Sequence, residues 1–505
     1  VSESHLNYFH HHPTIPRALI EKHREGLMLG TSCYKGELFQ AVLERRPAEE
    51  LEEIARFYDF IEVQPEENSQ MLVIRGQLTE LSQVRQVNQT LVELGERLNL
   101  PVTATGDAHF LDPEDAIFRT IIKNSIDAEA KYSDDQPPLF FKTTEEMLSD
   151  FAWLGEEKAR EIVVENPGKI ADEIGEITLY PRHPENKTTF APVWDTAPED
   201  IRRMTEERAH ALYGDQLPAL IQERMDKELK AIIGYGYSTL YHIANKLVSK
   251  SLDDGYMVGS RGSVGSSFVA TMCGITEVNP LPPHYRCGHC RTVDFAVNKE
   301  EHQVGIDLPD KNCPDCGQPL IKDGFDIPFE VFLGFKGDKV PDIDLNFCGE
   351  YQANAHGYVE ELFGKGYVFR AGTIGTLQEK TAYGYVLKYL ENRGLSVSSA
   401  EKTRLAMGCI GVKRTTGQHP GGMVILPKGY EINQFTAVQY PANDDKKPIT
   451  THFDFRSMHD ILVKVDVLGH DDPTMIRMLQ DLTGVNPQQI PLDDRDTMRD
   501  RKSVV

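Results

Sequence analysis

Two short segments alternate acidic and apolar residues, and this alternation constrains the fold more than any other feature of the sequence. They read VPDIDLNF at residues 340–347 and LVKVDVLG at residues 462–469. Side chains of a β-strand point alternately to its two faces, so the acids of each segment share one face and the apolar residues share the other. Both segments are therefore predicted to be strands of a sheet that is apolar on one side.

Three acids in these segments, Asp342, Asp344 and Asp466, are candidate metal ligands. Asp342 and Asp344 lie roughly 7 Å apart by strand rise, and they repel each other unless cations lie between them. Carboxylates on adjacent strands can hold two Mg²⁺ ions, one to activate a 3′-hydroxyl and one to neutralise a triphosphate. Lys464, on the face of Asp466, would balance phosphate charge. A surface turn is the alternative for the first segment, and a Lys–Asp pair on an edge strand for the second.

Residues 256–267, YMVGSRGSVGSS, combine a strand-like start, a run of small residues and the start of an apolar helix. Backbone N–H groups in such a turn, together with the helix N-terminus, form a site for an anion. Gly262 would allow close approach, and Arg261 and Ser263 would add donors. We therefore predict a phosphate site here, with an ordinary tight turn as the alternative. The segment is not a Walker A loop, because no Gly-Lys-Ser/Thr follows.

Four of the eight cysteines form two Cys-x-x-Cys pairs that are separated by 22 residues. They are Cys287, Cys290, Cys313 and Cys316. Thiolates at this spacing are a strong signal for Zn²⁺. A site with four protein ligands leaves no open position, so we predict a structural Zn²⁺ rather than a catalytic one. A disulfide is the alternative.

The first 150 residues contain a second set of candidate metal ligands. Strand-like runs at residues 60–63 and 101–105 alternate with helix-like runs at 49–58 and 82–98, which predicts an α/β layer or barrel. Asp107 and His109 follow the second strand-like run and share a face, and Cys33 follows another apolar run. Acid, imidazole and thiolate can bind divalent ions such as Zn²⁺ or Mn²⁺.

Charge is unevenly distributed along the chain. The net charge is −24, yet residues 356–428 hold ten Lys and Arg against five Asp and Glu. A local basic surface is what phosphate contacts require, although a solvated helix face is an equal alternative. No apolar run reaches the ~20 residues of a membrane span, and the N-terminus has no signal-peptide pattern. We therefore expect no membrane association and a cytoplasmic location.

Five motifs occur in the order found in bacterial family C replicative DNA polymerases: GSRGS, PDIDLNF, GTIGTLQEKTAYGYV, GVKRTTGQHPGG and LVKVDVLG. The chain closely resembles this family, in the PolC form of its DNA polymerase III alpha subunit, along essentially its whole length. The resemblance implies an α/β and α+β multidomain fold. A partial PHP (polymerase and histidinol phosphatase) domain, barrel-like in its β/α order, would precede a polymerase-beta-like nucleotidyltransferase palm with a helical thumb and a Cys₄ zinc module.

The same resemblance implies domain bounds. Residues 1–150 would be the C-terminal part of the PHP domain, 151–250 a helical connection and the start of the palm, 251–373 the palm with its zinc module at 284–320, 374–425 the thumb, 426–472 the rest of the palm, and 473–505 the start of the fingers. We expect the chain to be part of a longer polymerase and to extend primers poorly by itself, because nearly all of the fingers would be missing.

Residue roles follow from the resemblance as well. It places the palm acids on Asp342, Asp344 and Asp466, the triphosphate-binding Gly-Ser motif on Gly262 and Ser263, and the neighbouring lysine on Lys464. It implies nucleic-acid or nucleotide contacts for Lys380, Lys413, Arg414 and His419. Cys33, Asp107 and His109 match PHP ligand positions, and Glu62 matches less closely. The early His-x-His and Asp-His motifs of PHP domains are missing, so phosphoesterase activity does not follow.

The function expected from these motifs is template-directed DNA synthesis in chromosomal replication. It would use a primed DNA template, deoxynucleoside triphosphates and Mg²⁺, and release pyrophosphate. A sliding clamp and other replisome proteins would bind through regions outside this chain. Two alternatives stay open: a metal-dependent phosphoesterase in the PHP part, and a non-catalytic, zinc-stabilised DNA-binding module.

Overall fold

The computed structural model describes residues 1–10, 12–126, 136–185, 189–298, 300–334, 343–491, 494 and 496–497. The chain divides into two compact units. The first contains residues 1–14, 180–373 and 416–505, and the second contains residues 15–179 and 374–415. Both units combine helices and strands, which confirms the expected mixed α/β fold class. Within the described residues, no helix is both long and apolar enough to cross a membrane.

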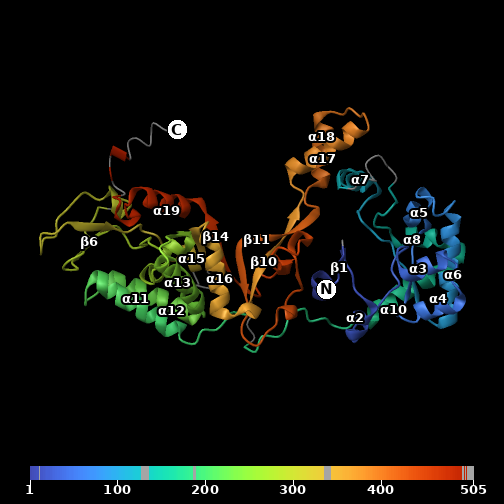
Figure 1. Ribbon diagram of the computed structural model, residues 1–505, viewed down its shortest axis with the longest axis horizontal. Helices are drawn as coiled ribbons and strands as arrows, with labels where there is room; N and C mark the ends of the chain where they lie inside the picture. The colour runs from blue at the N-terminus through green and yellow to red at the C-terminus, as the bar shows by residue number, and fades with distance from the viewer. Residues whose placement is uncertain are drawn as a thin grey trace. The chain divides into compact units, whose positions relative to one another are not determined.

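Seven strands form a mixed sheet in the first unit, in the order β12–β13–β10–β11–β14–β9–β5. Figure 1 labels β10, β11 and β14 of this sheet. β9 and β14 run parallel, whereas β11 is antiparallel to β14 and β5 is antiparallel to β9. The bounds are β5 (Val258–Arg261), β9 (Asp344–Cys348), β10 (Val368–Thr376), β11 (Lys413–Ile425), β12 (Val438–Gln439), β13 (Thr450–Asp454) and β14 (Val463–His470).

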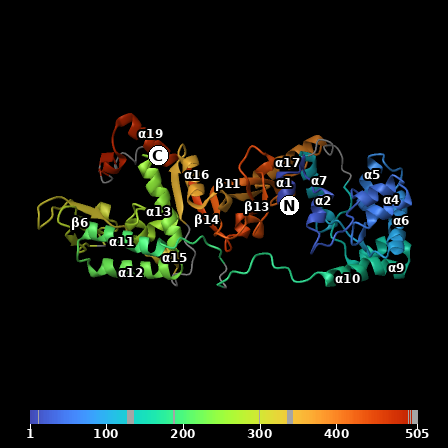
Figure 2. The same cartoon turned by 60° about the horizontal axis from the view of Figure 1, so that its bottom comes forward.

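Helices cover the apolar face of this sheet. Leu345 and Phe347 of β9 and Val465 and Val467 of β14 lie in one core with side chains from α13, α14 and α16. Each such side chain contributes about 1.5–3 kcal/mol on burial. Figure 2 shows α11, α12 and α13 side by side. The helices of this unit are α1 (Ser2–Leu6), α11 (Ala197–Tyr213), α12 (Ala219–Gly234), α13 (Ser238–Asp253), α14 (Phe268–Met272), α15 (Glu330–Leu333), α16 (Gln352–Phe363) and α19 (Asp471–Thr483).

Two small antiparallel sheets complete the first unit. One consists of β6 (His284–Cys287), β7 (Val293–Asp294) and β8 (Leu320–Asp323), with β6 in the middle. The other pairs β1 (Phe9–His10) with β2 (His12–Pro13). The three-stranded sheet carries the four cysteines of the predicted zinc module at its ends and turns.

The second unit is built around two parallel strands. β3 (Ile61–Val63) pairs with β4 (Val102–Ala104), and the long helix α6 (Ser82–Leu98) packs on them. These elements match the strands and the helix that the periodicity predicts. The remaining helices of residues 15–179 are α2 (Arg17–Lys22), α3 (Glu37–Leu43), α4 (Ala48–Ala55), α5 (Gln70–Ile74), α7 (Ala116–Ile126), α8 (Thr144–Asp150), α9 (Glu156–Arg160) and α10 (Asn166–Glu173).

Two helices from late in the sequence also belong to the second unit. α17 (Glu379–Asn392) and α18 (Ser399–Cys409) pack against α7, and all three are labelled in Figure 1. Figure 2 shows α17 and α7 from a second side. Ile121 of α7 shares a buried cluster with Val386 of α17 and with Leu405 and Cys409 of α18. Gly408 is required at this contact, because a Cβ there would lie 2.2 Å from the ring of Phe118.

One strand differs from the sequence prediction. The strand-like start of the 256–267 segment predicted a strand at residues 256–259, but β5 covers Val258–Arg261. The carbonyl of Tyr256 instead accepts a hydrogen bond from Ser251 at the end of α13. Pairing with β9 begins at Val258 and continues through Arg261, so Arg261 is a strand residue rather than part of the small-residue turn.

Candidate active site

The two acidic strands lie next to each other in the sheet. In the parallel register of β9 and β14, Asp344 is the direct partner of Asp466. Adjacent strands are about 4.8 Å apart, so the backbones of Asp344 and Asp466 lie closer together than those of two acids that share a face of one strand. The register also places Arg261 of β5 opposite Asp344 and Gly422 of β11 opposite Asp466. Arg261, Asp344, Asp466 and Gly422 therefore form one row across four strands.

Asp466 is buried, and only one of its two carboxylate oxygens is paired with a positive charge. It is 6% exposed, and its Oδ2 lies 2.6 Å from Nζ of Lys464. Nδ1 of His419 lies 3.6 Å from Oδ1, but this nitrogen accepts the backbone N–H of Gly422 at 2.7 Å. An imidazole nitrogen that accepts a hydrogen bond carries no proton to donate. Consequently, Oδ1 of Asp466 has no hydrogen-bond donor among the described residues.

The carboxylate oxygens of Asp344 and Asp466 are suitable ligands for a divalent cation. A buried carboxylate oxygen without a donor is costly, and a neighbouring carboxylate adds repulsion. Asp344 is half-buried on the same face as Asp466, so a cation between them would relieve both penalties. Asp342, the third predicted ligand, lies outside the described residues.

Lys464 lies on the same face of β14 as Asp466, as the alternation predicts. Its ammonium also lies 4.9 Å from the centre of the Phe455 ring, and its side chain is 16% exposed. The aromatic ring and the carboxylate together hold this cation at the edge of the acidic pair. The ammonium of Lys464 is therefore positioned to interact with an anion that binds beside Asp344 and Asp466.

The Gly-Ser loop follows β5 directly. Gly262 has φ +75°, which places it in the left-handed region, and the next residue, Ser263, is partly buried. The Ser266 hydroxyl donates to the Ser263 carbonyl at 2.6 Å and thereby braces the loop. Arg261 is exposed at the start of the loop. The predicted phosphate-binding residues thus begin beside Asp344.

The structure corrects one part of the loop prediction. The N-terminus of α14 does not face a free anion site, because the side chain of Glu228 caps it. The carboxylate accepts the backbone N–H groups of Phe268 and Val269, both at 3.0 Å, and the hydroxyl of Ser267 at 2.9 Å. The start of α14 is therefore occupied, which leaves Arg261, Gly262 and Ser263 as the remaining predicted phosphate-binding residues of this loop.

No sequence motif indicated a role for Glu228 or for its partner Arg224. Both lie on α12, where they form an ion pair at i and i+4. Glu228 is fully buried, and this burial raises the pKa of its carboxyl, which Arg224 opposes. The available signal was an acid within the apolar, helix-spaced positions of α12, where Ile221 and Leu229 are also buried.

The predicted nucleic-acid contacts fall in different units. Lys380 is exposed on α17, and Lys413 and Arg414 are exposed at the start of β11, all in the second unit. Arg414 lies 5.9 Å from the ring centre of Tyr385. His419 belongs to the first unit, where it contacts Asp466.

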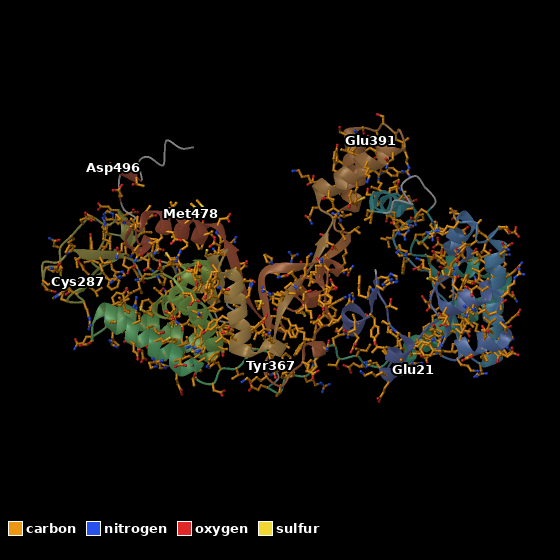
Figure 3. The ribbon with its side chains drawn as sticks, in the orientation of Figure 1. Glu21, Cys287, Tyr367, Glu391, Met478 and Asp496 are labelled. Atoms are coloured by element: carbon orange, nitrogen blue, oxygen red, sulfur yellow. The ribbon has the colours of Figure 1, made fainter. Side chains whose placement is uncertain are left out.

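The four cysteines of the two Cys-x-x-Cys pairs converge at one point. All four sulfur atoms lie within 4.8 Å of one another, and they form the only group of three or more candidate ligands at this separation among the described residues. Cys287 is labelled in Figure 3. The Sγ–Sγ distances of 3.4 Å for Cys287–Cys316 and Cys290–Cys313 exclude disulfide bonds. They approach the roughly 3.8 Å expected between thiolates around a tetrahedral Zn²⁺.

Hydrogen bonds favour a thiolate at one of the four cysteines, Cys287. The backbone N–H groups of Cys290 and His289 lower the pKa of the Cys287 thiol to about 6, so a thiolate is favoured at neutral pH. His284 takes no part, because it is fully buried with Nδ1 2.7 Å from the Pro282 carbonyl.

The N-terminal candidate ligands are less closely assembled. Nε2 of His109 lies 3.5 Å from Oδ1 of Asp107, and both follow β4. Glu62 of β3 accepts hydrogen bonds from the Ser32 N–H at 3.0 Å and the Thr105 hydroxyl at 3.2 Å. Cys33 does not join Asp107 and His109 in a group with donor atoms within 4.8 Å of one another, among the residues that the structure describes.

A buried histidine beneath β14 predicts a pH dependence of stability. Burial, with the nearby charge of Arg370, lowers the pKa of His356 from 6.5 to about 4, and Nε2 lies 3.2 Å from the Val467 carbonyl. The unfolded chain takes up this proton below pH 6.5 and the folded chain does not, so stability present above pH 6.5 is lost as the pH falls toward 4. We expect a loss of about 2 kcal/mol in the unfolding free energy at pH 5 from this group.

Urea unfolding at pH 7 and pH 5 measures this loss. His356→Gln is the comparison, because it removes the titrating group. An equal pH dependence in His356→Gln and in the wild type would contradict the assignment to His356.

A comparison of the sequence with models of protein families shows which family the chain belongs to. Residues 199–402 and 391–469 match the model of the bacterial DNA polymerase III alpha NTPase domain, and together they cover more than half of the chain. The chain belongs to the bacterial DNA polymerase III alpha family. The matched residues include the Gly-Ser loop, the four cysteines, both acidic strands and Lys464. Membership confirms the resemblance that the five motifs indicate.

Relatives of the family match nearly the whole chain. DNA polymerase III PolC-type of Clostridium perfringens is 55% identical over 497 residues, which is 98% of this chain and 34% of the relative. The PolC-type enzyme of Caldanaerobacter subterraneus is 56% identical over 499 residues, covering 99% of this chain and 35% of its own length. The DNA polymerase III PolC-type of Bacillus cereus is 54% identical over 501 residues, which is 99% of this chain and 34% of the relative. The chain thus spans about a third of the length of these polymerase III relatives.

Proposed function

We propose that this chain carries the nucleotidyl-transfer site of a replicative DNA polymerase. The observation that carries the proposal is the pairing of Asp344 with Asp466 on adjacent parallel strands, with one buried oxygen of Asp466 lacking a donor from the described residues. Family membership and the PolC-type relatives support the same activity. The enzyme would copy a primed DNA template from deoxynucleoside triphosphates in the bacterial cytoplasm.

Each side chain of the site has a defined task in this proposal. Asp344 and Asp466, with Asp342, would hold two Mg²⁺ ions, which supply Lewis-acid activation of the primer 3′-hydroxyl and neutralise the triphosphate. Arg261, Gly262 and Ser263 would bind the triphosphate from the β5 side of the acids. Lys464 would meet the negative charge of the leaving pyrophosphate from the β14 side.

We further assign the finer architecture by family. Residues 1–150 would be the later part of a PHP domain, the seven-stranded sheet a polymerase-beta-like palm, and α17 and α18 the thumb, with Lys380, Lys413 and Arg414 contacting DNA. The four cysteines would hold a structural Zn²⁺, since four thiolates leave no open coordination position. A sliding clamp and other replisome proteins would bind elsewhere in the full-length protein.

A primer-extension experiment with the full-length protein separates this proposal from its alternatives. With Mg²⁺ and a primed template, the wild type should extend the primer and Asp344→Asn should not. The double variant Asp107→Ala/His109→Ala should extend normally, because these residues belong to the candidate PHP site. Loss of extension only in the PHP double variant would instead place the chemistry there. Unimpaired extension by Asp344→Asn would leave only a non-catalytic DNA-binding role.

A further inference from the structure

Glu228 is fully buried beside the Gly-Ser loop and pairs with Arg224, whose side chain is 17% exposed. This ion pair is not part of the proposed reaction. Among the described residues, the hydrogen bonds to the Glu228 carboxylate come either from Arg224 or from the segment that ends the loop. The loop-side donors are the hydroxyl of Ser267 and the N–H groups of Phe268 and Val269. Glu228 therefore holds the C-terminal end of the loop.

Arg224 binds the same loop at Ser266, one residue before Ser267, the first residue that Glu228 binds. Its guanidinium donates to the carbonyl of Ser266 at 2.6 Å and to the carbonyl of Ile327 at 3.0 Å. The hydroxyl of Ser266 in turn donates to the carbonyl of Ser263 at 2.6 Å. An unbroken chain of hydrogen bonds thus runs from Glu228 through Arg224 and Ser266 to Ser263, a predicted triphosphate ligand.

A second set of contacts fixes the orientation of Ser267. The Tyr241 hydroxyl donates to Ser267 Oγ at 3.0 Å, and the N–H of Ala270 donates to the same oxygen at 3.1 Å. The single proton of Ser267 is therefore directed to Glu228. At the other end of the loop, Ser260 Oγ lies 2.7 Å from Thr276 Oγ1. Both ends of the loop are therefore anchored by hydrogen bonds.

A contribution to folding stability does not by itself explain why an ion pair occupies this position. Removing two charges from water costs several kcal/mol per ion, and well-packed apolar residues of similar volume are often equally stabilising. A guanidinium–carboxylate pair does add fixed geometry, because each donor and acceptor admits a narrow range of directions. Here that geometry is directed at residues 266–269, apart from the one bond from Arg224 to the Ile327 carbonyl.

We propose that Arg224 and Glu228 are positioning residues that hold the Gly262–Ser266 loop in the conformation that binds the triphosphate of the incoming nucleotide. This inference rests on the proposed polymerase function. Neither side chain touches the substrate; both act through Ser266 and the start of α14. A displaced loop would weaken triphosphate binding in the ground state and the transition state alike, so KM for the nucleotide would rise and kcat would change little.

Single-nucleotide incorporation by the full-length protein on primed DNA, with one deoxynucleoside triphosphate varied, tests the proposal. Glu228→Gln keeps the shape but loses the charge and one acceptor oxygen, and we expect its KM for the nucleotide to rise about tenfold. The double variant Arg224→Met/Glu228→Leu replaces the pair by apolar side chains of similar volume, and its KM should rise at least as far. In both variants, kcat, affinity for primed DNA and zinc content should stay within twofold of the wild type.

Lys227→Met is the matched control, since Lys227 lies on the same helix and pairs with Glu330 at the surface. Its KM should equal that of the wild type. A folded variant of the pair with wild-type KM would overturn the proposal, and so would failure of both variants to fold, which would show a purely structural pair. These results differ from failure of the polymerase assignment, in which the wild type itself would not extend the primer.

Discussion

Replacing Asp466 by asparagine should lower the rate of nucleotide incorporation by about a thousandfold, or ~4 kcal/mol in activation free energy. Asparagine keeps the size of the side chain but removes the charge that faces Asp344 and Lys464. The cation shared by the two strands would lose one of its ligands, and the ammonium of Lys464 would lose its partner. Single-turnover incorporation by the full-length protein with Mg²⁺ measures the effect directly.

Mn²⁺ binding in the absence of nucleotide supplies an independent readout of the same variant. Electron paramagnetic resonance should show weaker Mn²⁺ binding in Asp466→Asn than in the wild type. Asp460→Asn is the matched control, because Asp460 is 89% exposed just before β14 and should leave rate and Mn²⁺ binding unchanged. A rate within tenfold of the wild type in Asp466→Asn would remove this carboxylate from the chemistry.

Replacing Cys313 by serine should release the metal of the four-cysteine cluster and unfold the surrounding sheet. Metal binding to such sites contributes about 10–16 kcal/mol in small zinc domains, so losing one thiolate is expected to remove most of the local stability. The affected residues are those of β6, β7 and β8, because their few apolar contacts cannot replace the metal. Zinc content by mass spectrometry should fall from one ion to none at this site.

Hydrogen exchange locates the unfolding. Backbone amides of residues 284–323 should lose protection in Cys313→Ser, while amides of β9 and β14 keep theirs. Cys409→Ala is the control, because this cysteine is buried in the cluster of α7, α17 and α18 and contributes no ligand. Retention of the zinc ion in Cys313→Ser would show that the four sulfur atoms are not its ligands.

Alternation was sufficient to predict the acidic face of the sheet, and packing explains why. Leu345 and Val467 are paired in register, and both are buried in one core. A slip of one residue would turn the apolar face to water, so the same burial that forms the sheet also aligns Asp344 with Asp466. The predicted position of Asp342 in this site stays a prediction. The zinc cluster was predictable for a similar reason, since spacing alone brings each cysteine pair together.

Contacts between distant segments could not be predicted in this way. The expectation that the start of α14 faces a phosphate was wrong because its occupant, Glu228, lies 40 residues before Phe268 in the sequence. A local pattern of small residues predicts the turn, but it does not reveal which distant side chain binds the N–H groups that follow the turn. The contact of Asn124 with Arg393 joins residues 269 positions apart, and no periodicity reports such a pairing.

The packing of α17 and α18 on α7 has a practical consequence for protein production. A shortened version that begins at residue 180 would retain both late helices but lack the surface that covers them. Val386, Leu405 and Cys409 would then meet water, and the truncated protein is expected to aggregate during purification. Expression vectors for the polymerase region therefore need to encode residues 116–126 as well.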